Sequence, residues 1–343
     1  MKFRCKMIDT MAMRDFTNIV NIVSRMSRMC VICLTPTQMC FNACQDGTPV
    51  VWAELSHKHF FNEYLVVGVS DLQNEIYLEF DAVMLGTSLS SLKQTARSTK
   101  IKLTNKLQPC LTIEIELPTL TTESCLCVHD VPVRVIPRKE WPIYKAPNIP
   151  DFHICIDLPP LKQVRKIVER MKNMSPCLMV CAENSGKFVL KIDTDSASVA
   201  THFEGLHVST YSEDNAAQIT ANVDVRRFLT FLAWEVVHPV SVKCNILNEQ
   251  MIYLYLNLDD NRSQFLLEGH QTVLQFFLLS DLKNKYFFRY LNPIVEVDRI
   301  VILNEGKKNA HDVIELVFEM LLLQLDSLDF LIQGGDFPAV GNQ

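Results

Sequence analysis

The sequence has few of the features that mark membrane-spanning, secreted or low-complexity proteins. Its 343 residues include only 10 glycines and 15 prolines, which leaves no room for a long low-complexity linker. The longest apolar stretch, near 316–325, is interrupted and flanked by acidic residues, so no uncharged run of about 18 residues exists. Three of the first six residues are basic, and Asp9 follows them instead of a long apolar run. We therefore expect a soluble, intracellular globular protein.

Signatures of catalysis are also missing. The sequence contains no G-x-G-x-x-G, no G-x-x-x-x-G-K-[ST], no H-E-x-x-H and no G-x-S-x-G pattern. Asp193 and Asp195 lie one residue apart without a third acidic partner nearby, which is typical of a polar surface rather than a metal site. We expect a protein that is not an enzyme, with no catalytic residues, no cofactor and no metal.

Cysteine is the one abundant reactive residue type, with 12 copies. The closest group consists of Cys30 and Cys33 followed by Cys40 and Cys44, a spacing that leaves a zinc site as one interpretation. Both pairs lie in strand-like segments separated by only six residues, and adjacent strands of a tight hairpin converge poorly on a tetrahedral ion. We favour buried thiols that pack as small hydrophobic groups.

Period-two alternation of apolar and polar residues dominates what is present and predicts antiparallel sheets, as in 111–117 and 251–256. Helical spacing occurs in four segments: from about Met13 to Met29, after Asp81, from Pro159-Pro160, and after Asp224. The first and third helices start about 146 residues apart and the second and fourth about 142 apart. We infer an α+β fold in which one unit is used twice.

The proline-rich stretch 138–151 separates the two units and is expected to be an extended connecting loop. The predicted division is a first domain at 1–137, the connecting loop at 138–151, a second domain at 152–280 and a C-terminal extension of uncertain structure at 281–343. Either 263–267 or 273–279 forms the last strand of the second domain. The extension is a partner-binding helix, a packed addition to the second domain or a non-native sequence.

Basic side chains are concentrated on the polar faces of the predicted helices. The generous spans 14–28, 81–100, 160–172 and 224–235 together carry +8, whereas the remainder of the chain carries −14. A charged stripe is ordinarily the solvated face of an amphipathic helix. If the helices line one face together, however, they form a surface suited to phosphate contacts without base readout. The fourth helix is weakly basic and is followed by Glu235, so its contribution to phosphate contacts is left open at this point.

Longer motifs add a resemblance to a known family. They are MKFR at 1–4, NEIYLE at 74–79, IKLTNK at 101–106, HDVPVRVIPRKEW at 129–141, LPPLK at 158–162, VERMKNMS at 168–175 and FLAW at 231–234. In order and spacing, from Met1 to about residue 260, the sequence resembles the HUS-one (hydroxyurea-sensitive one) checkpoint protein family. Members of that family are subunits of the nine-one-one DNA-damage sliding clamp, a relative of PCNA.

The resemblance implies a PCNA-like DNA clamp: two similar domains, with antiparallel sheets outside and two helices per domain lining the inner face. Together with the basic stripes, it predicts these DNA-facing residues: Arg14, Arg25, Arg28, Lys93, Arg97, Lys162, Arg165, Lys166, Lys172 and Arg226. In clamp relatives the connecting loop and the groove beneath it receive peptides of repair enzymes. Here that implies Trp141, Tyr144 and Ile149, with Val133 and Val135 below. Alternatively, Trp141 and Tyr144 hold the loop against its own domain.

The function that the resemblance implies is that of a non-catalytic subunit of a heterotrimeric checkpoint clamp, which encircles DNA, tethers repair enzymes and supports checkpoint signalling. The expected partners are the two other clamp subunits, a clamp loader, double-stranded DNA without sequence specificity, and DNA repair enzymes, with no membrane. We expect residence in the nucleus, with a cytoplasmic pool before ring assembly. The alternatives are a homotrimeric replication-type clamp and a clamp-like interaction protein that no longer encircles DNA.

Overall fold

A computed structural model describes residues 1–45, 48–70, 73–90, 96–118, 125–146, 149–210, 218–258 and 272–279. All of them belong to one compact unit, Met1–Leu291. In this described part of the chain, no helix is both long and apolar enough to span a lipid bilayer.

The described elements follow the same order twice. The first series is β1 (Lys2–Met7), α1 (Thr10–Met26), β2 (Met29–Leu34), β3 (Gln38–Gln45), β4 (Thr48–Ser56), the short α2 (His57–Phe60), β5 (Glu63–Val67), β6 (Ile76–Asp81), α3 (Ala82–Leu89), β7 (Ser98–Asn105), β8 (Pro109–Leu117) and β9 (Cys125–Val135). A 3₁₀ helix, η2 (Arg138–Tyr144), lies in the connecting segment.

The second series is β10 (Ile154–Asp157), α4 (Leu161–Met171), β11 (Cys177–Glu183), β12 (Lys187–Asp193), β13 (Ser198–Phe203), β14 (Val208–Thr210), β15 (Ile219–Asp224), α5 (Val225–Leu232), the 3₁₀ helix η3 (Ala233–Val237), β16 (Ser241–Leu247), β17 (Met251–Asn257) and β18 (Val273–Leu279). Apart from α2, η2 and η3, each series reads strand, helix, five strands, helix, three strands. The predicted α+β duplication is therefore confirmed in the order of elements. Of the two candidate last strands, 273–279 is a strand, and 263–267 lies outside the described residues.

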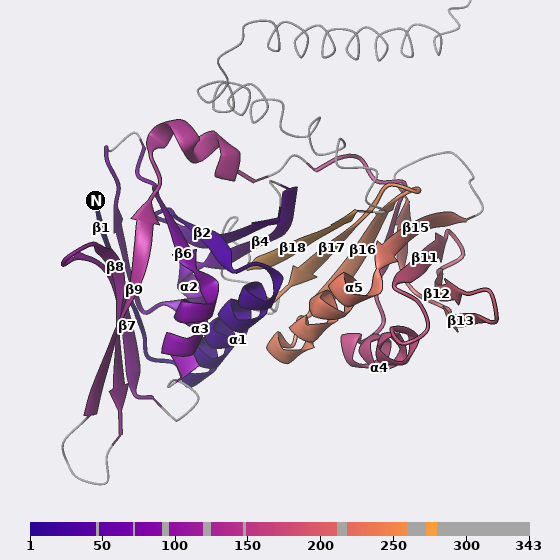
Figure 1. The fold of residues 1–343 in the computed structure, drawn as a ribbon, viewed down its shortest axis with the longest axis horizontal. Helices are drawn as coiled ribbons and strands as arrows, with labels where there is room; N and C mark the ends of the chain where they lie inside the picture. Colours follow the sequence, from indigo (N-terminus) through magenta and orange to yellow (C-terminus); the bar gives the residue numbers. More distant parts are fainter. Residues whose placement is uncertain are drawn as a thin grey trace, which may run out of the picture. The chain divides into compact units, whose positions relative to one another are not determined.

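The strands form antiparallel sheets that surround the helices on the outside (Figure 1). A fourteen-stranded sheet among the described residues has the order β14-β10-β16-β17-β18-β4-β3-β2-β6-β9-β8-β7-β1-β5, and a four-stranded sheet has the order β13-β12-β11-β15. The two series meet where β18 pairs with β4, with Val273 opposite Glu54 and Phe276 opposite Val51. A strand from the end of the second series thus completes a sheet of the first.

Aspartates start three of the four longer helices. Asp9, Asp81 and Asp224 each accept hydrogen bonds from two backbone N–H groups of the following turn, at 2.8–3.3 Å. Such a cap satisfies donors that the helix itself leaves unpaired. The start of α4 follows Pro160 instead, whose carbonyl accepts from the backbone N–H of Gln163 at 2.8 Å. The helix starts predicted after Asp81, Pro160 and Asp224 are confirmed.

Apolar side chains pack on both faces of the large sheet. The main core lies between the helices and the sheets and holds the apolar stripes of α1, α3, α4 and α5. A second, smaller cluster lies on the opposite face of the central strands and includes Tyr77, Trp141, Phe152 and Tyr253. This outer cluster brings the connecting segment onto the sheet surface.

Candidate functional site

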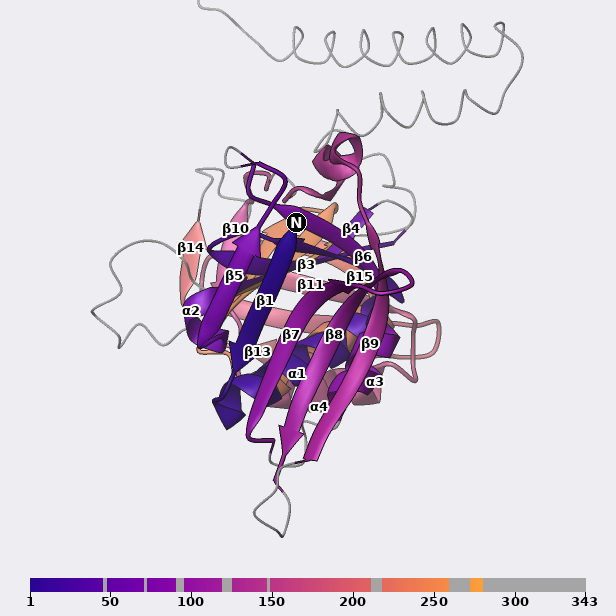
Figure 2. The same cartoon turned by 90° about the vertical axis from the view of Figure 1, so that its left-hand side faces the viewer.

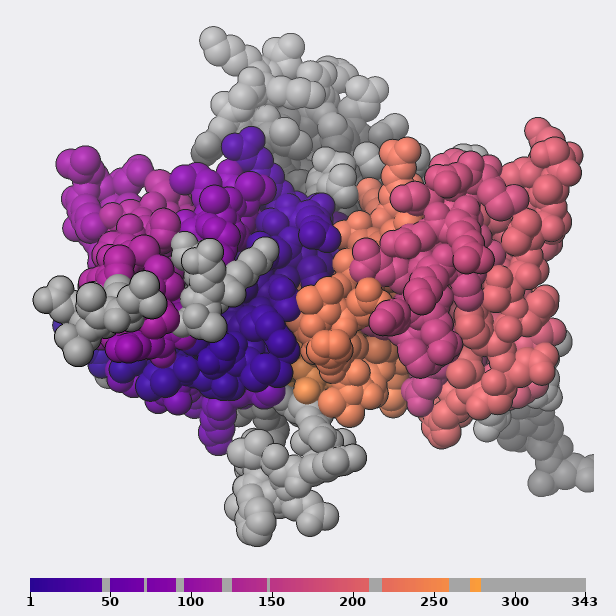
Figure 3. Space-filling view, turned by 90° about the horizontal axis from the view of Figure 1, so that it is seen from below, coloured from indigo at the N-terminus to yellow at the C-terminus, as the bar shows by residue number. Residues whose placement is uncertain are grey.

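Helices α1, α3, α4 and α5 share one side of the sheets. Packing contacts join α1 to α3, α1 to α5, and α4 to α5, which gives the order α3-α1-α5-α4 along that side (Figure 1). From below, the indigo surface of the first series borders the orange surface of the second directly (Figure 3). The expectation that the helices of both units line one face is therefore met.

Several of the predicted DNA-facing cations are exposed and form no ion pair among the described residues; these are called the uncommitted cations below. Side chains of Arg25, Lys162, Lys166, Lys172 and Arg226 are exposed, and within the described residues none of them forms an ion pair. Arg25 lies in the last turn of α1, where a cation also complements the partial negative charge of the helix C-terminus. Cations without internal partners keep their full charge available for an external anion.

Three other predicted cations are already paired with carboxylates. Arg28 donates from Nε to Asp81 Oδ2 at 2.9 Å, and this bond lowers the pKa of Asp81. Arg165 reaches both Glu169 and Glu235, at 3.0 and 2.9 Å. A phosphate that approached these cations would have to compete with a fixed carboxylate, so we rank them below the uncommitted cations as anion contacts. Arg14, 3.6 Å from Asp15, is in the same position.

The second basic stripe differs from its expected form. The span 81–100 was assigned to the helix that follows Asp81, with Lys93 and Arg97 facing DNA, but α3 ends at Leu89 and Lys100 lies within β7. Arg97 is exposed just before β7, and its backbone N–H donates to Glu116 O at 2.8 Å, which extends the ladder to β8. The segment 98–105 is a strand in spite of the helical spacing before it, because it pairs with both β1 and β8. Lys93 lies outside the described residues.

One basic residue on the helix side was not singled out from the sequence. Arg170 is exposed in the last turn of α4 and forms no ion pair among the described residues. The signal was available, because Arg170 follows Lys166 by four residues and so lies on the same side of the helix. With Lys162, Lys166 and Lys172 it makes α4 the most basic of the four helices.

Two half-buried carboxylates lie where α1 of the first series contacts η3 of the second. Asp15 Oδ1 and Glu235 Oε2 are buried without a hydrogen-bond partner among the described residues. Burial raises the pKa of Asp15, against the opposing effect of nearby Arg14. A cleft of about 800 Å³ opens beside them, lined by Arg14, Lys162, Glu235 and other residues of α1, the start of α4 and the segment after η3. Its charges are mixed, so it is no anion site by itself.

The connecting segment is held firmly against its own sheet. Trp141 is only 7% exposed, and its ring lies against Tyr77 with centroids 4.8 Å apart. The indole Nε1 donates to Ile136 O at 3.0 Å, and the guanidinium of Arg138 lies 5.9 Å from the ring centroid. Of the two interpretations of Trp141, these contacts favour the one in which it anchors the loop. Tyr144 is half-buried, whereas Ile149 is 49% exposed.

Val133 and Val135 do not lie beneath the loop, so their expected placement is wrong. They pair directly with Phe80 and Leu78 of β6, whose side chains belong to the core under the helices. Directly opposite residues share a face of the sheet. The face under the loop is instead formed by Tyr77, Glu79 and Arg134, and Arg134 Nε donates to Glu79 at 2.7 Å.

The cysteine pairs are divided between two faces of the sheet. Cys30 belongs to the core under the helices, whereas Cys33 and Cys40 lie opposite each other in the outer cluster. Burial raises the pKa of Cys30 and of Cys33 to about 12, which keeps both thiols protonated. Among the described residues no group of three or more histidine, cysteine or acidic side chains is placed to hold a metal ion.

Comparison with known proteins agrees with this geometry. A family model described as Hus1-like protein matches residues 1–280. The chain is 38% identical over 275 residues to checkpoint protein HUS1 of Homo sapiens, covering 77% of this chain and 98% of that protein. Its fold is similar to the proliferating cellular nuclear antigen of Entamoeba histolytica, with a TM-score of 0.59 and 11% identity, over 82% of this chain and 99% of that one. It is also similar to one chain of the PCNA2-PCNA3 complex of Sulfolobus tokodaii, with a TM-score of 0.56 and 13% identity, over 80% of this chain and 98% of that one. The fold is that of a PCNA-like clamp.

Proposed function

Because the chain belongs to the Hus1-like protein family, we propose that it is a non-catalytic subunit of a heterotrimeric DNA-damage checkpoint clamp. In this proposal the ring encircles double-stranded DNA without reading its sequence, tethers repair enzymes and supports checkpoint signalling. A clamp loader opens the ring, and the assembled ring acts in the nucleus, with a cytoplasmic pool of chain before assembly.

The observation that carries the proposal is the strand pairing inside the chain. The last strand of the second series, β18, pairs with β4, the fourth strand of the first. By order of elements, β9 corresponds to β18 and β13 corresponds to β4. Within the described residues, the 125–131 part of β9 pairs only with β8, and β13 pairs only with β12. If β9 of one subunit paired with β13 of the next in the same way, the subunits would join head to tail, as a ring requires.

The chemistry of the helix side supports a ring that slides. Arg25, Lys162, Lys166, Arg170 and Lys172 provide separate positive charges on helix surfaces and no base-reading element. Contacts of this kind bind phosphates weakly and depend on salt. A closed ring would be retained by its topology, so that no strong contact is required.

Ring composition is the finer part of the proposal. The PCNA2-PCNA3 complex is by its name a pairing of two different clamp subunits, which supports a ring of unlike chains. The two other checkpoint clamp subunits are therefore the proposed neighbours. Repair enzymes would dock at the connecting segment, where Ile149 is exposed and Tyr144 is half-buried beside the anchored Trp141.

Co-expression with the two other checkpoint clamp subunits, followed by size-exclusion chromatography with light scattering, tests the assembly. We expect a one-to-one-to-one complex and no trimer of this chain alone. A chain that trimerises by itself would point to a replication-type clamp, and one that stays monomeric with both partners present would refute the proposal.

A matched pair of variants tests which edge closes the ring. Leu126 and Val128, in the part of β9 that pairs only with β8 among the described residues, are 60% and 49% exposed. Leu65 and Val67 on β5, the strand that ends the same sheet, are 47% and 46% exposed. Replacing the first pair with aspartate should remove about 1 kcal/mol of apolar burial per side chain and weaken assembly roughly thirtyfold. The same change in the second pair should leave assembly intact. Equal loss in both variants would contradict the assignment of β9.

A further inference from the structure

Figure 2 shows the strands β5, β1, β7, β8 and β9 side by side, seen from the outside of the sheet. The outer face of this sheet, away from the helices, carries an unusual arrangement of charge. Phe3, Cys5 and Met7 of β1 point into the core, so Lys2, Arg4 and Lys6 stand on the opposite, outer face. On β7, Ile101 is in the core, which places Lys100 and Lys102 on the same outer face.

Like charges oppose each other directly across these two strands. Lys6 pairs with Lys100 in the register of β1 and β7, and Arg4 pairs with Lys102. Directly opposite like charges destabilise a sheet, because their side chains are close neighbours. The chain as a whole carries a net charge of −6, so acidic side chains to balance these cations are plentiful in the sequence. Arrangements that cost stability in this way are expected at functional sites, and opposed cations are suited to an anionic partner.

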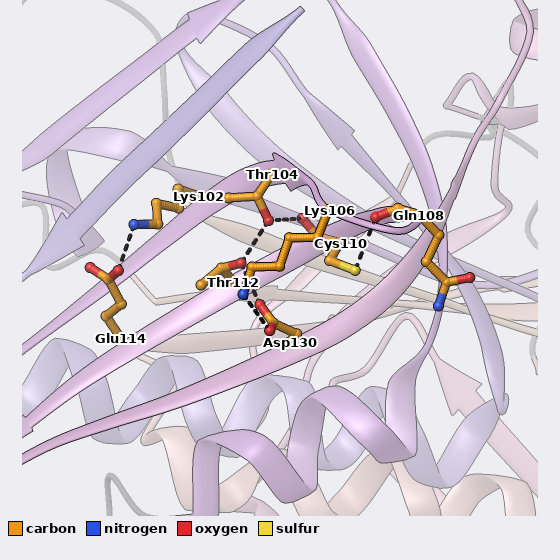
Figure 4. A network of polar contacts seen from close by, with 8 residues as sticks. All are labelled: Lys102, Thr104, Lys106, Gln108, Cys110, Thr112, Glu114 and Asp130. Carbon is orange, nitrogen blue, oxygen red and sulfur yellow. Dashed lines mark hydrogen bonds and ion pairs between the residues drawn. The ribbon is translucent and has the colours of Figure 1, made fainter.

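Towards β8 and β9, the cations of this same outer face are balanced by acidic side chains of the sheet itself, and Lys102 is one of them (Figure 4). Lys102 donates to Glu114, and Lys106 donates to Asp130 at 2.6 Å, while Thr112 donates to the other oxygen of Asp130 at 2.6 Å. On the β1 side, Glu63 alone lies near two cations, 3.6 Å from Arg4 and 4.0 Å from Lys6. Lys2 is exposed and forms no ion pair among the described residues. Lys100 is opposite Glu114 in the register of β7 and β8, but Glu114 accepts from Lys102, and the exposed Lys100 forms no ion pair within the described part of the chain.

Apolar side chains border these cations on the edge strand. Leu65 is opposite Arg4 and Val67 is opposite Lys2 on the outer face, and they are 47% and 46% exposed. Strand β5 also ends the sheet, and within the described residues its outer edge has no neighbouring strand. A peptide can use such an edge through backbone hydrogen bonds and apolar contacts, whereas nucleic-acid phosphates use neither.

We propose that the outer patch, defined as Lys2, Arg4, Lys6, Lys100, Leu65 and Val67, binds an acidic peptide segment of a partner protein. Acidic side chains of the segment neutralise the opposed cations of β1 and β7, and its apolar side chains cover Leu65 and Val67. The patch lies on the face of the sheet opposite to the helices, so a segment bound there leaves the helix side free for DNA. It is also separate from the connecting segment, which covers the outer face of β6.

A binding experiment on the full chain tests the patch with a short fluorescein-labelled peptide of alternating glutamate and valine. Arg4→Glu combined with Lys100→Glu reverses two charges of the patch, and Lys162→Glu combined with Lys166→Glu is the matched control on α4. We expect the patch variant to weaken peptide binding roughly tenfold or more, and the control to change it less than about twofold. A neutral variant, Arg4→Gln with Lys100→Gln, repeats the comparison without adding negative charge, and thermal melts verify that every variant is folded.

Four outcomes of the peptide measurement overturn the proposal. They are the absence of peptide binding by the parent chain, equal binding by the parent and both patch variants, a larger loss in the α4 control, and equal binding of a peptide of alternating lysine and valine. A fifth is that the patch variant loses affinity for a short DNA duplex while peptide binding is retained, which would make the patch a nucleic-acid contact.

Discussion

The uncommitted cations of the helix side allow a quantitative prediction about DNA binding. Arg25, Lys166 and Lys172 are exposed on α1 and at the middle and end of α4, without ion pairs in the described part of the chain. Replacing all three with glutamine removes three positive charges and no internal contact. Each such surface change usually alters the free energy of unfolding by no more than about 0.5 kcal/mol. A change in DNA binding therefore reports on the interface itself.

The size of the effect follows from counterion release. The plot of log Kobs against log salt concentration has a negative slope, and each phosphate contact that is lost makes this slope less steep by about 0.9. The loss of three contacts therefore makes it less steep by about 2.7. Near 0.15 M salt this corresponds to an affinity reduced roughly a hundredfold. Fluorescence anisotropy of a short labelled DNA duplex, measured over a range of salt concentrations, gives both quantities.

A control of the same composition is available on the outer face. Lys2, Arg4 and Lys100 are one arginine and two lysines, exposed on the side of the sheet away from the helices. Their replacement with glutamine should leave the salt slope unchanged. If the inner variant kept the parental slope, or if both variants lost the same amount, the assignment of the helix side as the DNA surface would be refuted.

Three further predictions follow from individual contacts. Trp141→Ala should cost about 3 kcal/mol of unfolding free energy through the lost packing on Tyr77, and should expose the connecting segment to trypsin; slow cleavage like that of the parent would contradict its anchoring role. Asp81→Asn keeps an oxygen to cap α3 but removes the carboxylate that pairs with Arg28. The slope of log Kobs for DNA against log salt concentration should therefore become steeper by about 0.9, and an unchanged slope would show that Arg28 does not reach phosphate. Burial raises the pKa of Asp15, so the folded chain binds this proton more tightly than the unfolded chain does, and stability is lost as the pH rises through the folded pKa. In urea titrations, the stability of Asp15→Asn relative to the parent should therefore be greater at about pH 7 than at about pH 4. Equal differences at both pH values would contradict the shift.

Local patterns carried the prediction of the fold a long way. The alternation in 251–256 and the aspartates before α3 and α5 are short-range signals, and each corresponds to a strand or a helix start. The assignment of Lys100 to the helix after Asp81 was wrong, because the helical spacing of the sequence continues into a segment that pairs with two strands. Only long-range pairing decides between the two, since a short amphipathic run fits either structure.

The sites were harder to predict, because they depend on which residues meet across the fold. Alternation in β9 shows that Val133 and Val135 share a face, but it does not show whether that face meets the helices or the connecting loop. The bond between Arg28 and Asp81 joins residues 53 positions apart, and no local pattern distinguishes Arg28 from the unpaired Arg25. Exposed cations and neutralised ones are therefore separated only by the tertiary structure.

The pairing of β4 with β18 also has a consequence for synthesis of the chain. Strand β4 is complete at Ser56, whereas the strand that covers its edge ends at Leu279. At a translation rate of about 5–20 residues per second, the ribosome needs roughly ten to forty-five seconds to make the intervening chain. Throughout that interval the edge that includes Val51 and Trp52 has no strand to pair with, and such an edge is a ready template for aggregation. We therefore expect that a chaperone would protect β4 of the nascent chain until the last strand has emerged.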